Sequence, residues 1–100
     1  MADKPSPSQA RVHVYYGGRV QGVGFRYTVE GLAHRAGLLG FVKNLSDNRV
    51  ELVCEGGKEK IDALLDEIRA SALGRYIQKV DCLWEEPTGA FADFTVEFDY

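Results

Sequence analysis

Apolar residues recur at every second position in several short stretches of the chain. In residues 11–16 the repeating positions are Val12, Val14 and Tyr16, with one residue between each. A period of two residues is typical of a strand with one buried face. The same pattern, or a short apolar run bounded by turn residues, predicts further strands over residues 40–45, 49–55, about 76–84 and 94–98.

After the first strand, and again after the third, the apolar spacing becomes helical. The first set comprises Phe25, Val29, Leu32, Ala33 and Ala36. The second set comprises Ile61, Leu64, Leu65, Ile68 and Ala72. Each set falls on one face of a helix. Gly37 and Gly74 follow these sets, and we predict that they end the two helices, because glycine readily takes the left-handed conformation found there.

The predicted order is βαββαβ plus a C-terminal strand. Right-handed crossovers would place both helices on the same face of one sheet. We therefore predict an α+β fold, a ferredoxin-like two-layer sandwich with two helices on one face of a mainly antiparallel sheet. The other face is expected to meet water, with His13, Tyr15 and Glu51 pointing outward. The pattern does not fix where the last strand pairs.

Composition narrows the class of protein. Residues 1–10 are polar and rich in proline and serine, which predicts a disordered N-terminal tail before one domain over residues 11–100. The formal net charge of −3 argues against a nucleic-acid partner. No segment approaches the ~20 apolar residues of a membrane span, and residues 1–10 lack the apolar core of a signal peptide. Cys54 and Cys82 have neither zinc-site nor redox spacing. We expect both to be reduced core thiols in a cytoplasmic protein.

The loop between the first strand and the first helix has the clearest chemical pattern. Gly18, Gly22 and Gly24 interrupt it, so successive backbone N–H groups can converge on one point. The start of the helix adds unpaired amides and a partial positive charge. Arg26 lies in the first helical turn, where its guanidinium can bind two phosphoryl oxygens at once. The loop predicts a phosphate-binding cup, although such glycines are common and an arginine at a helix start is usually only solvated.

Residues 18–26, GRVQGVGFR, and residues 40–44, GFVKN, resemble the two motifs of the acylphosphatase family, and the resemblance covers about residues 11–99. It implies a hydrolase of carboxyl-phosphate anhydrides that acts on a small acyl phosphate with no metal and no cofactor. We expect a monomer. Arg26 is implied to bind the substrate phosphate, and Asn44 to orient the attacking water. The family's phosphate cradle maps onto the backbone amides of Gln21, Gly22, Val23, Gly24 and Phe25.

One turn departs from the family pattern. The family often has Asp-Gly after the motif asparagine, whereas this chain has Asp47 followed by Asn48. Asparagine tolerates a positive φ. We therefore expect Asn48 to take that conformation and the hairpin to form.

Two other functions fit the pattern. The same fold can carry a non-catalytic phosphate-binding or regulatory module, which would bind an acyl phosphate without hydrolysing it. An RNA-binding ferredoxin-like domain is the second alternative, because residues 40–42, GFV, are similar to an aromatic motif on which such domains stack bases. The basic residue and the paired aromatics of that motif are absent here, and the net charge is unfavourable.

Overall fold

The computed structural model describes residues 9–98 of the chain, and its elements follow the predicted order. They are β1 (Gln9–Gly18), α1 (Phe25–Ala36), β2 (Leu39–Asn44), β3 (Val50–Gly57), α2 (Lys58–Ala70), a 3₁₀ helix (Ala72–Tyr76), β4 (Ile77–Glu85) and β5 (Phe94–Glu97).

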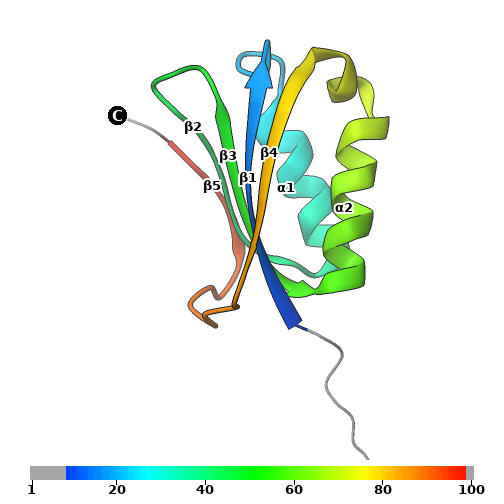
Figure 1. The fold of residues 1–100 in the computed structure, drawn as a ribbon, viewed down its shortest axis with the longest axis vertical. Coiled ribbons are helices and arrows are strands. Elements are labelled where there is room, and N and C mark those ends of the chain that lie inside the picture. The colour runs from blue at the N-terminus through cyan, green and yellow to red at the C-terminus, as the bar shows by residue number, and fades with distance from the viewer. Residues whose placement is uncertain (1–8, 99–100) are drawn as a thin grey trace, which may run out of the picture.

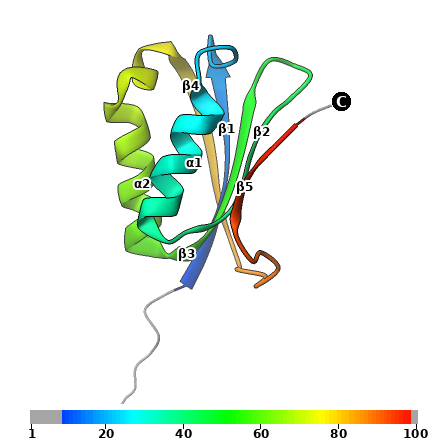
Figure 2. The ribbon, with the colours of Figure 1, turned by 180° about the vertical axis from the view of Figure 1, so that it is seen from behind.

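The strands form one sheet in the order β4-β1-β3-β2-β5. β1 pairs antiparallel with both β3 and β4, and β2 pairs antiparallel with β3. Both helices pack on the same face of this sheet (Figures 1 and 2), which confirms the predicted ferredoxin-like sandwich. β5, whose pairing the sequence left open, adds to β2 as a parallel edge strand.

The core lies between the helices and the covered face of the sheet. Val12, Val14 and Tyr16 of β1 are buried there, as their alternation predicted. The other strands and the helices contribute Phe25, Val29, Ala33, Val42, Val50, Leu52, Cys54, Ile61, Leu64, Ile68 and Phe94. Phe25 is the first residue of α1, so its burial fixes the start of the helix against the sheet.

Only one of the two cysteines is a core thiol. Cys54 on β3 is buried, and burial raises the pKa of its thiol to about 12. Cys82 is exposed, so the prediction that both are core thiols is wrong for this residue. The reason is that β4 is an edge strand, and most of its side chains are open to solvent.

The ends of two elements differ from the prediction. β1 begins at Gln9, so residues 9 and 10, expected to belong to the tail, pair with the end of β3. The remainder of the predicted tail, residues 1–8, lies outside the described residues. α2 ends at Ala70, well before Gly74.

The hydroxyl of Ser71 accounts for the earlier end of α2. It donates to the Ile68 carbonyl oxygen at 2.7 Å and accepts from the Leu73 amide at 3.1 Å. The first contact satisfies a carbonyl of the last helical turn, and the second starts the 3₁₀ helix.

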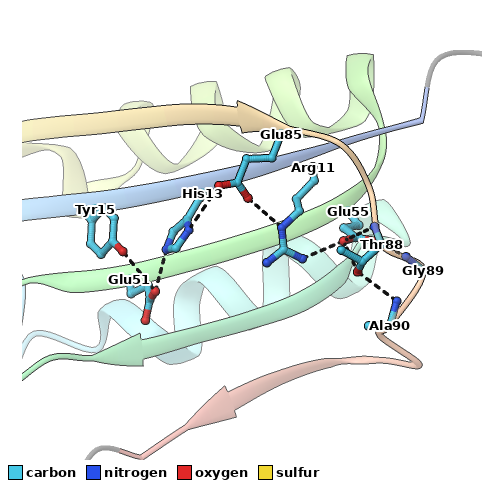
Figure 3. A network of polar contacts seen from close by, with 9 residues as sticks. All are labelled: Arg11, His13, Tyr15, Glu51, Glu55, Glu85, Thr88, Gly89 and Ala90. Carbon is cyan, nitrogen blue, oxygen red and sulfur yellow. Dashed lines mark hydrogen bonds and ion pairs between the residues drawn. The ribbon is translucent and has the colours of Figure 1, made fainter.

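A network of polar contacts covers part of the open face of the sheet (Figure 3). The Glu55 side chain is buried, and its carboxylate accepts hydrogen bonds from the amides of Thr88 and Gly89 at 2.9 and 3.0 Å. Arg11 donates to the same carboxylate at 2.8 Å. Burial alone would raise the pKa of Glu55, but these hydrogen bonds outweigh it and lower the pKa to about 2. Glu55 thus fastens the β4–β5 loop to the sheet.

A Glu55→Gln variant should lose about 3 kcal/mol of unfolding free energy at pH 7. The amide keeps the size of the side chain but loses the charge, and its NH₂ group would face other donors. The native pKa of Glu55 lies below the usual 4.5. The carboxylate therefore contributes its full stabilisation at pH values above about 4.5, and this contribution is lost as the pH falls towards 2.

Urea unfolding of parent and variant across this range provides the measurement. The gap between them should be constant from neutral pH to about pH 5 and should close towards pH 2. Glu59→Gln, a change at an exposed residue of α2, serves as the control and should leave stability nearly unchanged. A gap that stayed the same at pH 2 would contradict the assigned role.

Candidate active site

The loop after β1 has two glycines with positive φ just before α1. Gly22 and Gly24 have φ angles of 79° and 78°, in a region that residues with a Cβ rarely adopt. Gly24 is the N-cap of α1 and, as a glycine, has no side chain that could cap the first amides of the helix. Among the described residues, Thr28 is the first residue of α1 whose amide has a backbone hydrogen-bond partner, the Gly24 carbonyl oxygen at 3.1 Å. The amides before it lie at the positive end of the helix dipole.

Arg26 lies in the first turn of α1 and reaches the end of β5. Its Nη1 donates to the Glu97 carbonyl oxygen at 3.3 Å, and its guanidinium carbon is 5.1 Å from the centre of the Phe98 ring. Sequence reasoning did not find this contact, because it depends on the pairing of β5, which the pattern left open. The end of β5 therefore helps to set the direction of the guanidinium.

Asn44 is the last residue of β2 and is partly buried. Its Oδ1 atom is fully buried and has no hydrogen-bond partner among the described residues. A buried acceptor without a partner costs about 1–3 kcal/mol, and such atoms are rare in native proteins outside functional sites. The amide oxygen of Asn44 is therefore a buried acceptor whose hydrogen-bonding capacity the described residues leave unused.

The turn after Asn44 is ordered by its own polar groups. The Leu45 amide donates to the Arg49 carbonyl oxygen at 2.8 Å. The carboxylate of Asp47 accepts from the Arg49 amide at 3.2 Å and from its guanidinium at 2.8 Å, and these bonds lower the pKa of Asp47. Asn48 has a φ of 74°, which confirms the expected conformation. The hairpin forms without the glycine that the family often has.

One small pocket brings these groups together, with a volume of about 90 Å³. Its lining residues are Val20, Gly22, Gly24, Phe25, Arg26, Tyr27 and Asn44. The β1–α1 loop and the β2–β3 hairpin lie at the same end of the sheet (Figure 1). Two larger hollows elsewhere contain none of these residues.

The pocket includes most, but not all, of the predicted site. Arg26, Asn44 and three cradle positions line it, whereas Gln21 and Val23 belong to the loop without lining the pocket. Tyr27, 59% exposed, lines it as well and was not predicted. The sequence feature that could have identified Tyr27 is its position directly after Arg26 in the first helical turn.

The polar side chains among the lining residues are those of Arg26, Tyr27 and Asn44. Across residues 9–98 no three histidine, cysteine, aspartate or glutamate side chains gather where they could hold a metal ion. No helix in that range is long and apolar enough to cross a membrane.

Comparisons with known proteins point to one family. A family model described as Acylphosphatase matches residues 12–96. A protein of Trichormus variabilis named acylphosphatase is 42% identical over 85 residues, which is 85% of this chain and 84% of that protein. The solved acylphosphatase of Bacillus subtilis has a TM-score of 0.81 at 27% identity, covering 88% of this chain and 98% of its own. The acylphosphatase of Coxiella burnetii has a TM-score of 0.79 at 32% identity, covering 89% and 93%.

Proposed function

Because this chain belongs to the acylphosphatase family and is an acylphosphatase, we propose that Arg26, Asn44 and the amides of residues 21–25 carry out its reaction. The substrate is a small carboxyl-phosphate anhydride, and the products are a carboxylate and inorganic phosphate. The attacking water forms the new P–O bond, and the bond between phosphorus and the carboxylate oxygen breaks. The leaving carboxylate takes the electron pair of that bond.

Arg26 and the cradle bind the transferred phosphoryl group. The transition state of such a transfer is loose, with negative charge spread over the equatorial oxygens, so catalysis depends mainly on positioning and charge stabilisation. The amides at the start of α1 point at the bound oxygens and lie at the positive end of the helix dipole. The planar guanidinium of Arg26 adds two parallel donors and a full charge. Support for this role comes from the place of Arg26 in the pocket beside Gly22 and Gly24.

Asn44 orients the water. Its Oδ1 accepts a hydrogen bond from the water and directs the lone pair of the water oxygen at phosphorus, opposite the leaving carboxylate. The proton of the water passes to a phosphate oxygen of the substrate. Because a carboxylate leaves readily, the reaction needs little help from a general acid. This agrees with a pocket lining that contains no histidine and no carboxylic acid.

The observation that carries the proposal is that Asn44, whose buried Oδ1 has no partner among the described residues, lines the same pocket as Arg26. A phosphate-binding module would require the cradle and Arg26 but no acceptor for an attacking water. Membership of an enzyme family also favours hydrolysis over binding alone.

Hydrolysis of benzoyl phosphate in the presence of EDTA tests the proposed function. The folded protein should accelerate hydrolysis far beyond the spontaneous rate, and EDTA should leave kcat unchanged, because every proposed contact comes from the chain itself. A folded protein that bound inorganic phosphate without hydrolysing benzoyl phosphate would refute this proposal and favour the binding module. Loss of activity in EDTA that returned with added metal would refute the proposed donor set.

A further inference from the structure

The side chain of Gln21 connects the phosphate cradle to the hairpin after Asn44. Its Nε2 donates to the Leu45 carbonyl oxygen at 2.8 Å and to the Arg49 carbonyl oxygen at 2.9 Å. A carboxamide nitrogen has two hydrogens, so both are used in this link. The two carbonyls lie at the base of the β2–β3 turn, where the Leu45 amide donates to the Arg49 carbonyl.

Gln21 is the one cradle residue that can make such a link. Residues 22–25 are glycine, valine, glycine and phenylalanine, whose side chains carry no hydrogen-bonding group. Gln21 and Leu45 are 24 residues apart in the sequence. The position of Asn44 relative to the cradle therefore depends on tertiary contacts, and the carboxamide of Gln21 joins the two segments directly.

The distance between these segments matters for the reaction. Water must approach phosphorus to about 3–3.5 Å in the correct direction, and a misplacement of 1 Å can cost about 10²-fold in rate. The cradle holds the phosphorus, and Asn44, the residue directly before Leu45, directs the water. We propose that Gln21 is a positioning residue whose carboxamide fixes Asn44 relative to the cradle. The inference rests on the function proposed above for Asn44.

The chemistry of the link favours glutamine over similar side chains. Two carbonyl oxygens need two donors on one atom, which the carboxamide nitrogen supplies. Methionine has a similar length but no donor, and an ionised glutamate has only acceptors, which would face the two carbonyls. Asparagine is one methylene shorter. Gln21→Met thus removes the link with little change in volume.

A double-mutant cycle tests the inference on the full chain. The proteins are the parent, Gln21→Met, Asn44→Ala and the double variant, with benzoyl phosphate as substrate and inorganic phosphate as the binding probe. We expect Gln21→Met to lower kcat by about 10-fold or more and to change the Kd of phosphate less than about threefold, since Arg26 and the cradle amides stay. In the Asn44→Ala background the same change should cost less than about twofold, because residues that act as a unit are not additive.

Two further variants make the test specific. Gln9→Met, at the opposite end of β1 from the cradle, should keep kcat and KM near the parent values. Gln21→Glu should lose activity at pH 7, and the ratio of its kcat to that of the parent should rise as the pH falls towards 5. A protonated carboxylic acid regains one donor and with it part of the link, so a ratio that stayed the same between pH 7 and pH 5 would contradict the proposed contact.

The outcomes separate this inference from the proposed function. If the folded parent did not hydrolyse benzoyl phosphate, the proposed function would be refuted, and the inference with it. An active parent, together with an equal kcat loss from Gln21→Met in both backgrounds, would refute only the inference. A parallel loss of phosphate binding and kcat would also refute it, because Gln21 would then support the cradle and not the position of Asn44.

Discussion

An Arg26→Ala variant should hydrolyse benzoyl phosphate on the order of 10³-fold more slowly than the parent. The guanidinium supplies a full positive charge and a planar pair of donors to a group whose negative charge is spread over its oxygens in the transition state. Within residues 9–98 the Arg26 side chain makes one hydrogen bond, to the Glu97 carbonyl oxygen at 3.3 Å. This contact orients the side chain, but losing it should cost little stability. The measurement is kcat/KM, with thermal unfolding to show that the variant folds.

Arg26→Lys separates charge from geometry. Lysine keeps the positive charge but has no planar fork, so activity should still fall sharply, by at least about 10²-fold. Arg35→Ala provides a matched control, because Arg35 lies in the last turn of α1 and outside the pocket lining. It should keep kcat/KM within about twofold. Hydrolysis by Arg26→Lys at the parent rate would show that the phosphate site has been assigned to the wrong residue.

The parts of the fold that depend on local sequence could be predicted well. The alternation of Val12, Val14 and Tyr16 gave the buried face of β1, because side chains two residues apart on a strand share a face. Helical spacing gave the start of α1 at Phe25 and its end at Gly37, whose φ is 70°. The loop between these elements needed glycines at positive φ, and Gly22 and Gly24 provide them.

Contacts between segments far apart in the sequence could not be predicted in the same way. The parallel pairing of β5 with β2, and with it the contact between Arg26 and Glu97, leaves no mark in the periodicity of either segment. The exposure of Cys82 follows from the edge position of β4, which is a property of the whole sheet.

Gln21 shows the same limit inside the candidate site. The motif placed its backbone in the cradle, but the side chain points to carbonyl oxygens in a hairpin 24 and 28 residues away. Only the folded chain shows that the two motifs touch through this residue. Asn44 is a similar case, since its place in the motif could be predicted but the absence of a partner for its Oδ1 in the described residues could not.

An Asn44→Ala variant should lose on the order of 10²–10³-fold in kcat while retaining most of its affinity for phosphate. Alanine removes the buried Oδ1 that we propose directs the water, but Arg26 and the cradle amides still bind the phosphoryl group. The change also removes an unsatisfied buried acceptor, so the free energy of unfolding should stay constant or rise slightly. Single-turnover hydrolysis of benzoyl phosphate and titration with inorganic phosphate measure the two effects separately.

Two comparisons decide whether Asn44 acts on the water. Ser46→Ala changes an exposed residue of the same hairpin and should keep kcat near the parent value, which excludes a general effect of altering the turn. Asn44→Asp keeps an oxygen acceptor for the water but adds a negative charge beside the phosphoryl group. Its affinity for phosphate should therefore fall below that of Asn44→Ala. A kcat for Asn44→Ala within about threefold of the parent would exclude the proposed role, and the attacking water would then have to be oriented by the cradle alone.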